Sequence, residues 1–198
     1  MASIEHILPI PVYIHDADEN TFNTIKSEIQ NHQKIIKKLS NTHTWGDLVT
    51  TTFVQCRNIA LELNLQHLQN FLTEHISSFL NYLNFQNPVY VSESWFNSFV
   101  KGGMQDWHIH TSSHNGVGKN VLSGVYYYDG NYNEKDGSVI QLSPFYGSTS
   151  SPLLTQNANY NFEKQGGRLV IFSSALPHRV PYFKGKRNSF TFNVSLTV

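Results

Sequence analysis

The chain has 198 residues, the size of one ordinary domain with room for a substantial core. Hydrophobic residues make up 39% and aromatic residues 13%, which argues against a disordered chain and favours a β-containing fold. The 14 basic and 14 acidic residues balance, so the charge does not indicate nucleic acid or an anionic membrane as a standing partner.

The first part of the chain, residues 1–88, predicts a strand followed by helices. Residues 7–15, ILPIPVYIH, are apolar and β-branched, and their prolines are typical of an edge strand. Apolar residues then recur at helical spacing over 18–39 and again over 65–83, which predicts two amphipathic helices. The residues that we expect to cap these helices are Asp18 or Asn20 for the first and Asn64 for the second. Between the helices, residues 40–60 contain threonine and glycine breaks and predict a loop with a short helix.

From Val89 onward the hydrophobic period changes to two, which predicts strands. The β-rich segments are VYVSESWFNSF, MQDWHIH, VLSGVYYYD, SVIQL, GRLVIF and NSFTFNVSLTV. Several short strands after a pair of helices predict a mainly β fold, either a β-sandwich or a double-stranded β-helix (a cupin-like jelly roll), with helices on one outer face. We expect a single domain over 1–198, with the jelly-roll core in 89–198. The polar stretch 143–167 predicts a lid, a binding loop or a mobile loop.

The segment DWHIHTSSH, residues 106–114, carries His108 and His110 two positions apart. On a strand these side chains point to the same face, so both can contact one atom. His114 lies beyond a Thr-Ser-Ser turn and shares no such register. Alone, the pair is as typical of solvated or hydrogen-bonded side chains as of a metal site. A third ligand must come from elsewhere, and His178 is the candidate, at the end of the strand GRLVIF.

The last strand carries a polar pair on one face and an aromatic pair on the other. Arg187 and Ser189 are two residues apart, while Phe190 and Phe192 point the opposite way, toward a core. An arginine inside a barrel is unfavourable unless it meets an anion. Its planar guanidinium suits a carboxylate, and the serine hydroxyl suits the same oxygens.

Taken together, His108-x-His110, His178 and Arg187-x-Ser189 resemble the iron(II)- and 2-oxoglutarate-dependent oxygenases. That superfamily carries H-x-D/E, a distal histidine, and an Arg-x-Ser about nine or ten residues later; the spacing here is nine. The segments SGVYYY and GRLVIFSSALPHRV look like a bacterial and phage branch of it, and also like the prolyl-hydroxylase branch. The resemblance covers about 95–195, with a weaker match at ILPIPVYIH.

The resemblance implies a role for each matching residue. His108 and His178 would bind the iron, and Arg187 with Ser189 would bind the distal carboxylate of 2-oxoglutarate. The further positions that it assigns to the cosubstrate pocket are Tyr127, Ser123 and Asn97. Two of these have ordinary structural alternatives, since a run of three tyrosines must place one or two in a core and Ser123 is a strand-start hydroxyl.

The sequence departs from the family at His110, which stands where the family has a carboxylate. Iron(II) oxygenases usually bind their metal with two histidines and one carboxylate. Three neutral imidazoles leave the loaded site one unit of charge more positive. We expect His110 to be the third ligand, because the branch that the chain resembles commonly carries H-x-H. The rivals are Asp106, which shares the strand face of His108, a water, or a domain that has lost activity.

The resemblance implies an enzyme, a dioxygenase of the hydroxylase type. It would use iron(II), 2-oxoglutarate and O2, hydroxylate a substrate, and release succinate and carbon dioxide. One alternative is a cupin-like metal-binding protein that does not use 2-oxoglutarate, in which Arg187 would pair with a carboxylate such as Glu163 or Asp136. The other is a non-catalytic jelly-roll structural module with incidental histidines.

Partners and location follow from what the sequence lacks. The substrate is a peptide, a nucleotide or a small metabolite, and no motif decides between them; a homodimer is left open.

No apolar run approaches the ~20 residues that span a bilayer. The N-terminus lacks a secretion-signal pattern, and the single Cys56 fits a reducing compartment. We expect a soluble, cytoplasmic protein, and the branch resemblance makes a phage-encoded one an option.

Overall fold

Two antiparallel sheets and a layer of helices make up the part of the chain that the computed structural model describes, which is residues 10–43, 46–111, 119–130, 140–143, 158–160, 166–182 and 184–197. The helices are α1 (Glu19–Asn31), α2 (Gln33–Leu39), α3 (Ile59–Glu62) and α4 (Gln66–Tyr82). The first strands are β1 (Tyr13–Asp16), β2 (Asn41–His43), β3 (Gly46–Thr51), β4 (Val89–Phe99), β5 (Gln105–His108) and β6 (Asn120–Gly130). The later strands are β7 (Ile140–Leu142), β8 (Ala158–Tyr160), β9 (Arg168–Ser173), β10 (His178–Val180) and β11 (Arg187–Leu196).

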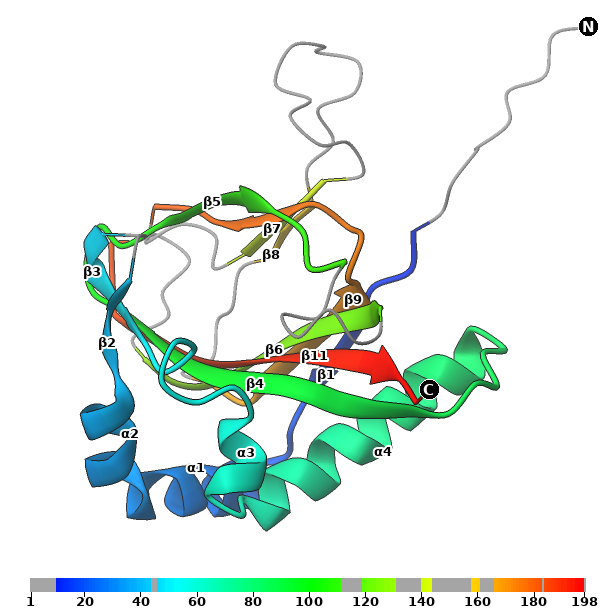
Figure 1. Ribbon diagram of the computed structural model, residues 1–198, viewed down its shortest axis with the longest axis horizontal. Helices are drawn as coiled ribbons and strands as arrows, with labels where there is room; N and C mark the ends of the chain where they lie inside the picture. Colours follow the sequence, from blue (N-terminus) through cyan, green and yellow to red (C-terminus); the bar gives the residue numbers. More distant parts are fainter. Residues whose placement is uncertain are drawn as a thin grey trace, which may run out of the picture.

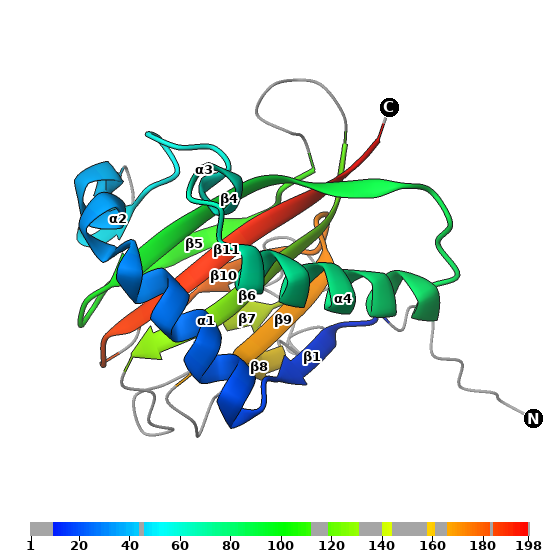
Figure 2. The same cartoon turned by 90° about the horizontal axis from the view of Figure 1, so that it is seen from below.

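The larger sheet has the order β1-β9-β6-β11-β4-β3-β2, and the smaller has the order β5-β10-β7-β8. Figure 1 shows the smaller sheet facing one side of the larger sheet. The helices cover the other side of the larger sheet. Seen from below, α1 and α4 cross this outer side (Figure 2). The predicted jelly roll with helices on one face is confirmed. None of the helices in the described residues is long and apolar enough to cross a membrane.

The alternation along β11 separates a core face from a polar face. Phe190 and Phe192 lie in the cluster that the helices cover, together with Phe96, Tyr126 and Ile171 of the neighbouring strands. The prediction that these two phenylalanines enter a core is therefore confirmed. The opposite side of the same strands faces the smaller sheet, and this is where the polar residues gather.

The helix predictions are right in position and wrong in detail. Asp18 caps α1, where its Oδ1 accepts hydrogen bonds from the amides of Asn20 and Thr21 at 2.9 and 3.0 Å. The helix expected over 18–39 breaks at His32 and forms two helices. At the second helix, Asn64 is not the cap, since it adopts a left-handed φ of 50° before the helix starts.

A side chain from another helix replaces the missing cap of α4. Both carboxylate oxygens of Glu28, on α1, accept hydrogen bonds from the backbone amides of His67 and Leu68, at 2.9 and 3.0 Å. These amides belong to the first turn of the helix, where N–H groups have no acceptor within their own helix. The capping group is 39 residues away in the chain, so no local signal could have revealed it.

Residues 40–60 contain more strand than we expected. A short helix, α3, begins only at Ile59, at the end of this stretch. Within the stretch β2 and β3 form a hairpin, and β3 pairs with β4 from Val49 opposite Phe99 to Thr51 opposite Asn97. The expectation of a loop is wrong for this stretch, because pairing with a distant strand stabilises threonine-rich residues in an extended form. At the opposite edge, the N-terminal strand predicted over 7–15 is present only as β1, because residues 10–12 are not strand and residues 7–9 lie outside the described part.

Candidate metal and cosubstrate site

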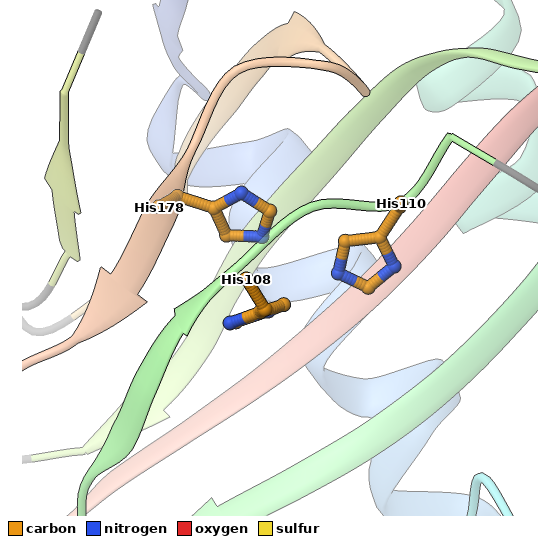
Figure 3. A group of neighbouring side chains, drawn as sticks. All are labelled: His108, His110 and His178. Carbon is orange, nitrogen blue, oxygen red and sulfur yellow. The ribbon is translucent and has the colours of Figure 1, made fainter. Parts of the chain in front are cut away.

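Three histidines meet on the inner side of the smaller sheet. His108 ends β5, His110 follows two residues later, and His178 opens β10, directly opposite His108 in the strand pairing. One candidate ligand atom from each lies within 4.8 Å of the others. Figure 3 shows the three rings gathered around one space. The prediction that residues 70 positions apart in the chain converge is confirmed.

Backbone carbonyls orient two of these rings in the same way. Nδ1 of His108 lies 2.7 Å from the carbonyl oxygen of Asp106, and Nδ1 of His178 lies 2.9 Å from that of Leu176. A carbonyl oxygen only accepts, so each Nδ1 carries the proton and donates it. The lone pair of each neutral ring is then on Nε2, which is the arrangement of metal-binding histidines whose other nitrogen is held by a carbonyl.

Burial keeps the three imidazoles neutral. Burial lowers the pKa of His108, and it lowers the pKa of His178 well below the ordinary value, with His108 and His110 adding to the effect. The pKa of His110 falls to about 3, mainly by burial and then by His108. Metals bind the neutral ring, so three neutral nitrogen donors within reach of one another fit a divalent ion such as iron(II).

The histidines share a cavity with the arginine of the last strand. The lining includes His108, His110 and His178 together with Arg187, and Arg187 is only 1% exposed. Its Nη2 donates to the carbonyl oxygens of Gly103 at 3.2 Å and Pro181 at 3.1 Å. Strand pairing with β4 places it beside Phe99, and its guanidinium carbon lies 4.5 Å from the centre of that ring. A fixed, buried positive charge therefore faces the same space as the three imidazoles.

A row of polar residues crosses three strands next to Arg187. Ser189 of β11 pairs with Asn97 of β4 on one side and with Tyr127 of β6 on the other, and all three line the cavity. Burial raises the pKa of Tyr127 although Arg187 opposes the shift, so the phenol keeps its proton. Nδ2 of Asn97 lies 3.2 Å from Oγ1 of Thr191, while its Oδ1 is buried without a hydrogen-bond partner among the described residues. The row thus offers hydroxyl donors and an open acceptor to a bound molecule.

Two of the residues that the sequence singled out do not line the cavity that the histidines share with Arg187. Ser123 is not in the cavity lining; its Oγ donates to Oδ1 of Asn193 at 2.8 Å and lies 2.9 Å from Oγ of Ser174. Asp106 is exposed, and its Oδ1 accepts from the amide of Trp107 at 2.7 Å. It does not join the histidine cluster, so the geometry favours His110 over this rival. His114 lies outside the described residues.

The sequence reasoning missed several residues that line the cavity. Trp95 and Thr191 belong to the same strand faces as Asn97 and Ser189, so strict alternation along β4 and β11 was the signal that could have found them. Gln105 also lines the cavity, three residues before His108.

A second, more open pocket reaches the same histidines from outside. Its walls are mainly aromatic, from Phe53, Trp95 and Trp107, and His108 and His110 line it as well. The ring centres of Trp95 and His110 are 5.8 Å apart in a stacked arrangement. The two histidines therefore stand between an inner cavity that contains Arg187 and an outer pocket with aromatic walls.

Comparison with known proteins identifies this arrangement. Residues 93–193 match the family described as "Putative 2OG-Fe(II) oxygenase". No curated protein matches the chain. Among solved structures, a prolyl-4-hydroxylase of Pseudomonas putida has a TM-score of 0.64 at 14% identity, over 95% of this chain and 94% of that one.

Two further solved structures are similar. A prolyl hydroxylase from Trichoplax adhaerens, in complex with a hypoxia inducible factor peptide fragment, has a TM-score of 0.65 at 13% identity, over 93% of this chain and 83% of its own. HygX from Streptomyces hygroscopicus, with nickel and 2-oxoglutarate bound, has a TM-score of 0.61 at 12% identity, over 95% and 84%. At these identities the structures support the fold, and the matched family carries the assignment. The chain belongs to the 2OG-Fe(II) oxygenase family and is an iron(II)- and 2-oxoglutarate-dependent oxygenase.

Proposed function

We propose that His108, His110 and His178 hold the iron, and that Arg187 binds the distal carboxylate of 2-oxoglutarate. The observation that carries this proposal is the single cavity in which three neutral imidazoles and a buried guanidinium face the same space. The residues that complete the proposed cosubstrate site are Ser189, Tyr127 and Asn97. Ser123 is left out of it, because it hydrogen-bonds to Asn193 and Ser174 outside the cavity lining.

Each residue has a defined task in this site. Arg187 supplies a buried positive charge that attracts a carboxylate, and the protonated hydroxyls of Tyr127 and Ser189 can donate to the same anion. The apolar cluster between the sheets, which includes Val125, Ile140 and Phe172, excludes water from the far side of the cavity and strengthens these contacts. When bound, iron(II) with O2 supplies the oxidising chemistry that converts 2-oxoglutarate to succinate and carbon dioxide and hydroxylates the substrate.

We infer that the substrate approaches through the outer pocket. Phe53, Trp95 and Trp107 give that pocket apolar walls, and it opens directly onto His108 and His110. A peptide is the first substrate class to test, because the similar structure from Trichoplax adhaerens holds a peptide fragment. A nucleotide and a small metabolite stay alternatives, and a homodimer, a cytoplasmic location and a phage origin stay predictions.

The experiment that tests the proposal is an anaerobic titration of the protein with iron(II), with and without 2-oxoglutarate. A visible charge-transfer band should appear only when both are present, because it arises from 2-oxoglutarate bound to the iron. His178→Ala should abolish the band. The control His67→Ala removes a histidine on α4, far from the cavity lining, and should leave the band intact.

Two outcomes would contradict the proposal. If the native protein forms no band, or if His178→Ala keeps it at full strength, the three histidines do not form the iron site. If the metal binds but 2-oxoglutarate adds no band, a cupin-like metal-binding protein becomes the better description.

A further inference from the structure

A buried tryptophan of β4 stands between the inner cavity and the outer pocket. Trp95 is 3% exposed, and it lines both the cavity that contains Arg187 and the pocket with aromatic walls. Its ring meets the ring of Phe53 edge to face, with the centres 4.8 Å apart, and it stacks beside the ring of His110 at 5.8 Å. These two contacts hold the indole next to a proposed metal ligand.

The indole nitrogen of Trp95 is left without an acceptor. Nε1 is buried and has no hydrogen-bond partner among the residues that the structure describes. An indole N–H can only donate, and a buried donor without an acceptor is unfavourable, so folded proteins rarely leave one in that state. Because Trp95 lines the inner cavity and the outer pocket, an acceptor for it would come with a molecule bound in one of these two spaces.

Strand pairing places Trp95 at the opposite end of the inner cavity from the backbone of Arg187. Three successive pairs of cavity residues join β4 to β11, and they are Phe99 with Arg187, Asn97 with Ser189, and Trp95 with Thr191. Each step is two residues, so the first and last pairs are about 13 Å apart along the strands. Since His110 lies beside Trp95, the indole is at the metal end of this row.

The chemistry of 2-oxoglutarate fits a donor at this end. The dianion offers two carboxylates and a keto oxygen, all of which accept hydrogen bonds and none of which donates. With its distal carboxylate at Arg187, its keto acid end is directed to the metal. A 2-oxo acid chelates a metal through the keto oxygen and one carboxylate oxygen, so the other oxygen of that carboxylate stays available. A charged oxygen forms the stronger hydrogen bonds, which favours the inner cavity over the mainly apolar outer pocket.

We propose that Trp95 donates a hydrogen bond from Nε1 to the carboxylate beside the keto group of 2-oxoglutarate. The inference rests on the proposed function, in which the three histidines hold the metal and Arg187 binds the distal carboxylate. It goes beyond that function by assigning a binding residue to the other carboxylate. The cosubstrate is then held at both ends, and the ring that orients its keto acid end also forms the wall toward the outer pocket.

Nitrogen-15 NMR of the Zn(II)-loaded protein tests the contact directly. The indole N–H signal of Trp95 is identified by its loss in Trp95→Phe. Saturating 2-oxoglutarate should move the proton of this signal downfield, because a hydrogen bond to a carboxylate deshields it. 2-Oxovalerate, which keeps the keto acid end but lacks the distal carboxylate, should move the signal in the same direction. The indole signal of Trp107, which lines the outer pocket and not the inner cavity, should move less.

Trp95→Phe keeps an aromatic ring in the wall but removes the donor. Isothermal titration into the Mn(II)-loaded variant should show 2-oxoglutarate bound about 10- to 150-fold more weakly, the range for loss of a hydrogen bond to a charged group. Binding of 2-oxovalerate should weaken by a similar factor. Arg187→Ala, in contrast, should weaken 2-oxoglutarate far more than 2-oxovalerate. The affinity of Trp95→Phe for Mn(II) alone should equal the native one, because the indole is not a metal ligand.

The control is Tyr126→Phe, which also removes a buried polar group that has no partner among the described residues. Tyr126 belongs to β6 of the same sheet, but its ring packs in the cluster that the helices cover, on the opposite face from the cavity. This variant should keep the native affinities for Mn(II), 2-oxoglutarate and 2-oxovalerate.

The outcomes separate this inference from the proposed function. If Arg187→Ala weakens 2-oxoglutarate as expected, while the Trp95 signal stays in place and Trp95→Phe binds both 2-oxo acids normally, the role of Trp95 alone is overturned. A Trp95→Phe variant that also loses affinity for Mn(II) overturns it too, because that pattern indicates general damage to the cavity. If the metal-loaded native protein does not bind 2-oxoglutarate, the proposed cosubstrate site itself is wrong.

Discussion

Arg187→Ala is the substitution that tests the proposed cosubstrate site most directly. Arg187 is 1% exposed, its guanidinium lies 4.5 Å from the ring of Phe99, and it faces the cavity that contains the histidines. A hydrogen bond to a charged group contributes about 1.5–3 kcal/mol. At about 1.4 kcal/mol per factor of ten, the alanine variant should bind 2-oxoglutarate roughly 10- to 150-fold more weakly. Isothermal titration of 2-oxoglutarate into the Mn(II)-loaded protein measures this change.

The control for that experiment removes a guanidinium outside the cavity lining. Arg179 contacts Gln141 and lies 4.9 Å from the ring of Trp107, so Arg179→Ala should leave the affinity for 2-oxoglutarate unchanged. Arg187→Lys should give an intermediate loss, because it keeps the charge but not the planar guanidinium that packs on Phe99. If folded Arg187→Ala binds 2-oxoglutarate as tightly as the native protein, the cosubstrate is held elsewhere and the reasoning fails.

Three further predictions concern the stability of the fold. Burial lowers the pKa of His75, and the neighbouring His15 adds to this effect. Below a pH of about 6.5 the unfolded chain therefore binds more protons than the folded protein does, and the free energy of unfolding should fall as the pH falls. Urea unfolding should show this decline, and a His75→Gln variant with an equally steep decline would contradict it. Gly124→Ala would place a methyl group 2.2 Å from Cζ of Phe192, so we expect a loss of about 1–3 kcal/mol, visible as a lower melting temperature. Glu28→Ala removes the cap of α4 and should cost about 1 kcal/mol in chemical unfolding, whereas an unchanged midpoint would mean that water replaces the carboxylate.

The sequence alone determined most of the elements, though not β2, β3 or the break between α1 and α2, and it determined which residues of a strand share a face. The spacing of apolar residues located α4, and the alternation along the last strand placed Phe190 and Phe192 in the core with Arg187 and Ser189 on the opposite side. These are properties of a few consecutive residues, because a helix or a strand repeats over two to four positions. The motif of two histidines, a distal histidine and Arg-x-Ser also indicated the family, because it depends on residue types and spacing alone.

Only the tertiary structure decided which residues outside the histidine and arginine motif meet across distant segments. Glu93 and Asn193 are 100 residues apart, and nothing near either one indicates that the amide of Asn193 donates to that carboxylate. The same is true of Ser123, which shares a strand face with Tyr127 but lies outside the cavity lining. The register between strands is set by the packing of whole sheets, so a local pattern predicts the direction of a side chain but not the partner that it finds there.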